Sequence, residues 1–100
     1  MTPTIYRYRF DREVPLSDVE ESLLLAVLAA EGLHGAASVD MDSASRLDKD
    51  PMRCVIDATT RVGRDIARIF TCFLIHEFGR DAFTVDALAP AGLSSREVRS

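Results

Sequence analysis

Apolar residues recur every three or four positions along residues 57–79, the most regular stretch of the chain. This spacing places them on one side of an α-helix. Thr59 and Thr60 offer hydroxyls that can cap a helix start, and Gly79 accepts the left-handed conformation found just past a helix end. The segment therefore predicts a helix whose apolar side is formed by Val62, Ile66, Ile69, Phe70, Phe73, Leu74 and Phe78.

Strict alternation of apolar and polar residues predicts strands at residues 4–10, 52–58 and 81–88, and a weaker alternation predicts another at 34–42. In the first strand aromatic residues alternate with Arg7 and Arg9. Because unpaired arginines are rarely buried, the aromatic side is expected to face the core. The residues expected to point inward are Tyr6, Tyr8, Phe10, Val39, Met41, Cys54, Ile56, Phe83, Val85 and Ala87.

A first helix is expected at residues 18–31. Ser17 and Glu20 have the spacing of a capping box, in which each side chain bonds a backbone N–H at the helix start. Gly32 is the expected stop. Residues 43–51 are polar and are expected to form a hairpin loop.

The resulting order, β-α-β-β-α-β, resembles the ferredoxin-like fold over residues 4–88. The resemblance implies an α+β two-layer sandwich, with an antiparallel four-stranded sheet and two helices on one face. The first and third strands are expected to be central. We expect one domain at 1–88 and a flexible C-terminal tail at 89–100, since the tail is small, polar and contains Pro90 and Gly92.

Composition narrows the classes of function. The 100 residues carry a net charge of −4, whereas a general nucleic-acid binder should be basic. Residues 1–50 hold 10 acids and 5 bases, and residues 51–100 hold 6 and 7, so only the second half suits an anion. No apolar run approaches the roughly 20 residues that span a bilayer, and the N-terminus is too charged for a signal peptide. A cytoplasmic protein without membrane contact is therefore expected.

No cofactor or metal is expected from the histidines and cysteines. His34, His76, Cys54 and Cys72 lack the paired spacing of metal ligands. Both cysteines lie in apolar surroundings that suit inert thiols, so a cysteine nucleophile is not indicated either. No catalytic residue is assigned, and the sequence leans against an enzyme.

Two polar groups of residues are candidate sites. The start of the second predicted helix combines free backbone N–H groups with Thr59, Thr60, Arg61 and Arg64, which could hold a small anion. The uncovered sheet face is expected to carry Arg7, Arg9, Arg53, Asp57 and Asp86, with Asp40 and Asp42 beside them. Such a face is either a solvated lattice of ion pairs or a charged docking surface. An enzyme built on Arg7, Arg9, Asp57 and Asp86 would have no recognised motif.

The helices carry more apolar residues than one buried face requires. Leaving a large apolar side chain exposed forfeits roughly 1.5–3 kcal/mol, so an apolar surplus usually indicates an interface. We therefore expect a non-enzymatic interaction module that self-associates or docks a protein partner. The candidate contacts are Leu24, Leu28, Ile69, Phe73 and Ile75. The alternative is a regulatory domain that binds a small anion or a nucleotide-like ligand at the second helix.

Several families with a ferredoxin-like fold can be set aside on their motifs. Acylphosphatases need a catalytic Asn and a glycine-rich phosphate loop, but the chain has no Asn and residues 10–15 contain no Gly. Metal-carrying domains of this shape need a CxxC loop, which is missing. RNA-recognition motifs place aromatics on the open sheet face, whereas Tyr6 and Tyr8 are expected to point inward.

Overall fold

The computed structural model describes residues 4–49 and 52–88 of the chain. Four strands and three α-helices follow one another, with a short 3-10 turn, Arg80–Ala82, before the last strand. Their bounds are β1 Ile5–Phe10, α1 Leu16–His34, α2 Ala36–Asp42, β2 Ala44–Lys49, β3 Met52–Asp57, α3 Arg61–Phe78 and β4 Phe83–Leu88.

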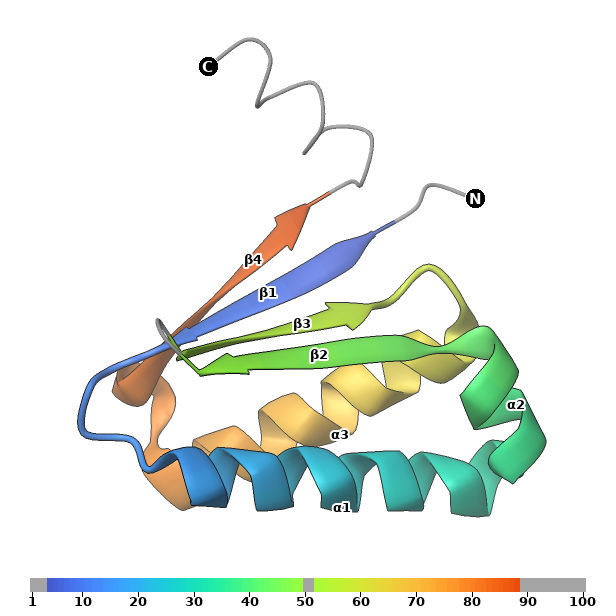
Figure 1. The fold of residues 1–100 in the computed structure, drawn as a ribbon, viewed down its shortest axis with the longest axis horizontal. Coiled ribbons are helices and arrows are strands. Elements are labelled where there is room, and N and C mark those ends of the chain that lie inside the picture. The colour runs from blue at the N-terminus through green and yellow to red at the C-terminus, as the bar shows by residue number, and fades with distance from the viewer. Residues whose placement is uncertain (1–3, 50–51, 89–100) are drawn as a thin grey trace, which may run out of the picture.

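The four strands form one antiparallel sheet in the order β2-β3-β1-β4. The mixed α+β class and the central position of β1 and β3 are therefore confirmed. Helices α1 and α3 run side by side beneath the sheet, while α2 turns up at one end of it (Figure 1). The ferredoxin-like prediction is thus matched only in part, because there are three helices and they do not all lie on one face.

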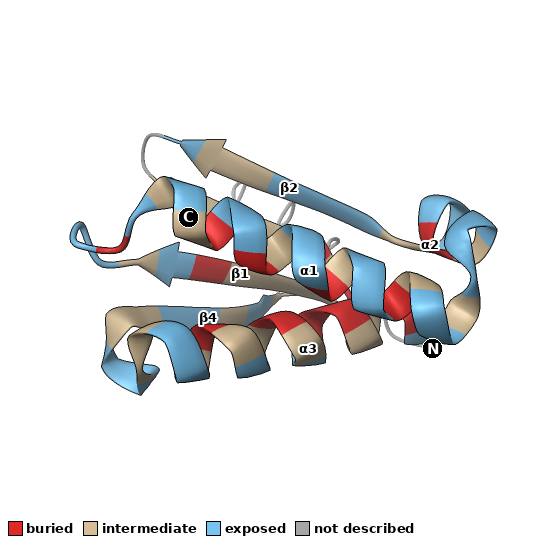
Figure 2. Ribbon diagram, turned by 90° about the horizontal axis from the view of Figure 1, so that it is seen from below, coloured by how far each residue is buried: buried red, intermediate tan, exposed pale blue. Residues whose placement is uncertain are grey.

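The core lies between the sheet and the two long helices (Figure 2). As predicted, the aromatic side of β1 faces it, and Tyr8 is only 1% exposed. The Tyr8 and Phe70 rings meet edge to face with their centres 4.9 Å apart. The Tyr8 hydroxyl donates to the Ala67 carbonyl at 3.1 Å and lies 2.7 Å from the Thr71 hydroxyl, so its polar end is satisfied inside the protein.

Helix α3 begins and ends as the sequence predicts. The Thr60 hydroxyl accepts a bond of 3.1 Å from the backbone N–H of Gly63, which otherwise lacks a partner in the first turn. Gly79 adopts φ +90°, where a side chain would be strained, and its N–H bonds the Ile75 carbonyl. This helix is the most accurate prediction from the pattern.

The bounds predicted for the first helix are wrong at both ends. Helix α1 starts at Leu16 after an extended Pro15, with no side-chain cap, so Ser17 lies inside the first turn and the capping box does not form. The helix also passes through Gly32 and ends at His34. Gly35 provides the stop instead, because it adopts the left-handed φ of +88°.

The strand predicted at 34–42 is wrong, since this segment is helix α2. Val39 is buried, but Met41 is 84% exposed, so the short alternation did not reflect two faces of a strand. The predicted hairpin loop instead contains strand β2, whose polar sequence is held by pairing with β3. Tertiary pairing has overridden a weak local preference here. Asp40 and Asp42 consequently lie on α2 and not on the sheet face.

Strand β4 forms as predicted but is less covered than expected. Phe83, Val85 and Ala87 pair with Phe10, Tyr8 and Tyr6, so they lie on the helix side of the sheet. Val85 is nevertheless 40% exposed, because β4 is an edge strand beyond the main cover of the helices. The predicted tail, residues 89–100, lies outside the described residues.

Within the residues that the structure describes, no single helix is both long and apolar enough to cross a bilayer. Only α1 and α2 taken together meet that test, by length and composition, and they are bent by 115° at their junction.

Candidate functional site

The outer side of α1 carries a compact group of exposed leucines. Val19, Ser22, Ala26 and Ala30 are buried against the rest of the protein. On the opposite side Leu24, Leu25 and Leu28 are 57%, 48% and 50% exposed. At 100° per residue these three side chains project within one third of the helix circumference. We call them the outer leucine face, and Figure 2 looks onto this side of α1.

Acidic residues border the outer leucine face. Glu20 and Glu21 precede it by one turn, and Glu31 follows it. The only basic side chain that α1 offers is His34, whose Nε2 lies 2.7 Å from a carboxylate oxygen of Asp65 on α3. The surface is therefore apolar at its centre and negative at both ends.

The other three predicted contacts lie on α3 and do not extend this face. Ile69 and Phe73 are partly buried and pack against the core. Ile75 is half-buried about 120° around the helix from Ile69 and lines a small depression with Arg68 and Cys72. Of the five residues singled out, Leu24 and Leu28 are the ones that stand in solvent. Leu25, which the sequence analysis missed, belongs with them, and the unbroken apolar run 23–30 was the signal for it.

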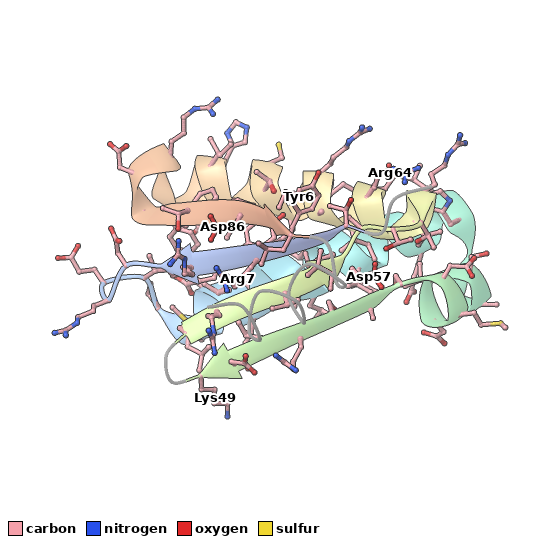
Figure 3. All side chains as sticks on the ribbon, turned by 90° about the horizontal axis from the view of Figure 1, so that it is seen from above. Tyr6, Arg7, Lys49, Asp57, Arg64 and Asp86 are labelled. Atoms are coloured by element: carbon pink, nitrogen blue, oxygen red, sulfur yellow. The ribbon has the colours of Figure 1, made fainter. Side chains whose placement is uncertain are left out.

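The open sheet face is a lattice of ion pairs (Figure 3). Asp86 on β4 accepts from both Arg7 at 3.2 Å and Arg9 at 3.0 Å. Asp48 on β2 lies 3.1 Å from Arg46 and 4.0 Å from Arg53. The sequence analysis missed Asp48 and Arg46 because it assigned β2 to a loop. Opposite charges on neighbouring strands contribute about 0.2–1 kcal/mol per pair.

The charged sheet face meets the start of α3 at one edge and has an apolar depression between its charges. Asp57 lies at its rim and accepts a 2.9 Å bond from the Thr59 N–H, which ties it to the start of α3. A shallow depression of about 470 Å³ runs over Ile5, Val55 and Leu88, so its floor is apolar between the charges. Four of the five residues predicted for this face therefore form ion pairs, and the fifth, Asp57, bonds the backbone.

The start of α3 uses its polar groups within the chain. The Thr59 hydroxyl accepts from the Thr4 N–H at 3.2 Å, and the Thr60 hydroxyl donates to the Asp42 carbonyl while it caps Gly63. Arg64 donates to the Thr59 carbonyl at 3.1 Å. Arg61 is exposed on the first turn. The four residues predicted to hold an anion are thus adjacent, but three of them already serve the fold.

The cysteines and histidines do not gather into a site. Among the described residues, no three His, Cys, Asp or Glu side chains are grouped as metal ligands would be. Cys54 on β3 is buried as expected, whereas Cys72 is exposed on α3, so the expectation of apolar surroundings is wrong for Cys72. Burial raises the pKa of the Cys54 thiol to about 12, so this sulfur is protonated and inert at neutral pH.

Stability should fall as the pH rises above about 9. Burial raises the pKa of Cys54 from 9.0 and that of Tyr8 from 10.0, each to about 12. Both groups therefore hold their protons more tightly in the folded chain, and alkali favours the unfolded chain between pH 9 and 12. Urea unfolding at stepped pH checks this. Cys54→Ala should remove the decline that begins near pH 9 and leave the one that begins near pH 10; a stability independent of pH across this window would contradict it.

Three surfaces therefore hold the candidate residues: the outer leucine face, the charged sheet face and the start of α3. The last two pair or bond most of their polar groups internally. On the outer leucine face, by contrast, about half of each side chain is left exposed by the described residues. No protein-family model matches the chain, and no curated protein is significantly similar to it.

Proposed function

We propose that this chain is a small non-enzymatic interaction module that self-associates through the outer leucine face of α1. The observation that supports this most is the exposure of Leu24, Leu25 and Leu28, each about half in water on one side of a helix. Contiguous exposed apolar side chains of this size usually belong to an interface. Covering these side chains would stabilise the associated form by roughly 25 cal/mol for each Å² of apolar surface removed from water.

A second copy of the chain is the proposed occupant, because the face is self-complementary. In an antiparallel crossing centred on the outer side of α1 midway between Leu24 and Leu28, Leu24 of one copy meets Leu28 of the other, and this contact repeats across the twofold axis. Helices that cross at about 50° diverge away from their contact point. Glu20, Glu21 and Glu31 then remain in water at the two ends of the contact.

The proposed contact is weak. Helix α1 has 19 residues and is about 28 Å long, so one crossing buries less than the roughly 1,200 Å² of a standard interface. Like charges at the rim oppose association and are screened by salt within about 10 Å at 0.1 M. We therefore expect a dimer that forms with rising concentration and is strengthened by moderate salt.

The proposal extends to the fold and the compartment. Read from the other edge, the strand order is β4-β1-β3-β2, and we propose that the fold is a ferredoxin-like variant in which α2 is an added helix before β2. Two free thiols suit a reducing cytoplasm. An anion bound at the start of α3 is the weaker alternative, because the chain already uses Thr59, Thr60 and Arg64 for its own hydrogen bonds.

Replacing Leu24 and Leu28 together by Glu should abolish association through the outer leucine face and leave the fold intact. Both side chains project from the surface, so the monomer loses little packing, while two carboxylates would be forced into the contact. A matched control adds the same two charges at Ala36 and Ala37, which are exposed on α2. Size-exclusion elution and circular dichroism check both variants. If the leucine variant unfolds, these residues belong to the core and the proposal is wrong.

A further inference from the structure

The two edges of the sheet are unequally protected. Strand β2 carries Arg46, Asp48 and the exposed edge residue Lys49, and charged side chains of this kind discourage pairing with another strand. Strand β4 has no lysine and no proline between Phe83 and Leu88. Its single charge, Asp86, is already neutralised by Arg7 and Arg9. Edge β4 therefore lacks the usual devices that keep strands apart.

The backbone groups on the free edge of β4 can be assigned from the ladder. The Asp11 N–H donates to the Ala82 carbonyl at 2.9 Å, in line with the register that pairs Phe10 with Phe83. Hydrogen-bonded and non-bonded pairs alternate along antiparallel strands. Thr84, Asp86 and Leu88 thus point their N–H and C=O groups at β1. Those of Phe83, Val85 and Ala87 point away from the sheet.

An apolar groove lies beside this edge on the helix side of the sheet. It encloses about 320 Å³ between β4 and α3. Val85 forms one wall, and the rest is lined by Tyr6, Tyr8, Ala67, Arg68 and Thr71. A strand added at β4 would direct every second side chain toward this groove, as in recognition by strand addition.

We propose that β4 pairs antiparallel with β4 of a second copy, with Val85 opposite Val85. The two sheets then join into one continuous sheet with the helices of both copies on the same face. In this register Phe83 of each copy lies opposite Ala87 of the other. The outward-pointing backbone groups of Phe83, Val85 and Ala87 then all form hydrogen bonds across the contact. The two Val85 side chains lie next to each other at the mouths of the two grooves.

Charge selects this register over its neighbour. With Val85 opposite Val85, each Asp86 faces Thr84 of the other copy. A shift of one residue on each strand would bring Asp86 opposite Asp86, and like charges directly opposite each other destabilise a sheet. That shift would also leave Phe83 without an outward partner in the strand. The contact is separate from the outer leucine face, so either one can fail without the other.

Cross-linking through one introduced cysteine, with the native Cys54 buried, tests the register. In a Cys72→Ser background, Val85→Cys should give a covalent dimer with diamide, which takes up the two electrons and two protons released by the thiols. Bonded antiparallel partners lie about 5.5 Å apart at Cα, within the span of a disulfide. Ala87→Cys is the matched control on the same strand and face. It should not cross-link, because its counterpart lies four residues away along the partner strand, roughly 13 Å.

Val85→Pro separates this contact from the one on α1. Proline removes only an N–H that points off the sheet, and edge strands tolerate it there. The circular dichroism spectrum should be unchanged, while the dimer that forms through β4 is lost. The Leu24→Glu, Leu28→Glu variant should still cross-link through Val85→Cys. Equal cross-linking from Val85→Cys and Ala87→Cys, or none from either, would overturn the β4 pairing and leave the α1 contact unaffected.

Discussion

Gly63→Ala is expected to destabilise the protein by about 3 kcal/mol, even though alanine is the better helix former. A Cβ at this position would overlap the backbone oxygen of Asp57 and lie 3.0 Å from its carbonyl carbon. Helix α3 approaches the end of β3 there with no room for a methyl group. Backbone atoms cannot rotate out of the way as a flexible side chain would, so α3 must shift away from the sheet.

Gly32→Ala is the matched control. Gly32 also lies inside a long helix, but a Cβ there meets nothing within 4 Å. It should stabilise the protein by about 0.5–1 kcal/mol, because alanine loses less backbone entropy in a helix. Thermal unfolding of dilute protein should therefore move in opposite directions for the two variants. At 4–8 °C per kcal/mol, the Gly63 variant should melt roughly 12–24 °C lower. Similar melting temperatures would contradict the close approach of α3 to β3.

Phe70→Ala should cost about 3–5 kcal/mol, the range for deleting a fully buried phenylalanine. Its ring is completely buried and meets Tyr8 edge to face, at the point where α3 crosses the middle of the sheet. Removing it leaves a cavity that the β1 backbone and the hydrogen-bonded Tyr8 hydroxyl prevent from closing. Urea unfolding measures the loss.

Phe73→Ala gives the comparison on the same helix. This ring is only partly buried against the core, so its loss should cost roughly half as much in proportion to the apolar area released. If the near-ultraviolet circular dichroism of the Phe73→Ala variant shows that the remaining aromatic side chains stay packed, this result would support the position of Phe73 at the margin of the core. A cost below about 1 kcal/mol for Phe70→Ala would show that the core is not centred on this residue.

The sequence predicted best where two signals agreed. Helix α3 has both a long apolar stripe and distinct end signals at Thr60 and Gly79, and both signals act locally. The alternation in β1 and β3 predicted which side of each strand is buried, because a central strand covered on one face has no other stable orientation.

Prediction failed where tertiary contacts decided the outcome. Strand β2 has a polar sequence, and only its pairing with β3 reveals it as a strand. Gly32 and Gly35 could each end helix α1. The helix ends at Gly35 because the backbone turns there into α2. The exposure of Val85 could not be predicted either, since it depends on β4 being an edge beyond the helices.

Tertiary packing also limited how much of the outer leucine face could be predicted from the sequence. A surplus of apolar residues in the helices is visible in the sequence and drew attention to Leu24 and Leu28, which are exposed in the structure. Their exposure depends on which side of α1 packs on the sheet. The same surplus on α3 is largely absorbed by the core, as the packing of Ile69 and Phe73 illustrates.

Light scattering across a concentration series is the most direct test of self-association through α1. It should be run on the Val85→Pro background, so that only the outer leucine face can hold two copies together. The mass should rise from 11.0 kDa toward twice that value with concentration, and rise further with moderate salt. Adding Leu24→Glu and Leu28→Glu should hold it at 11.0 kDa throughout. If the Val85→Pro chain with its native leucines has the mass of one chain at every concentration, the proposed function is contradicted.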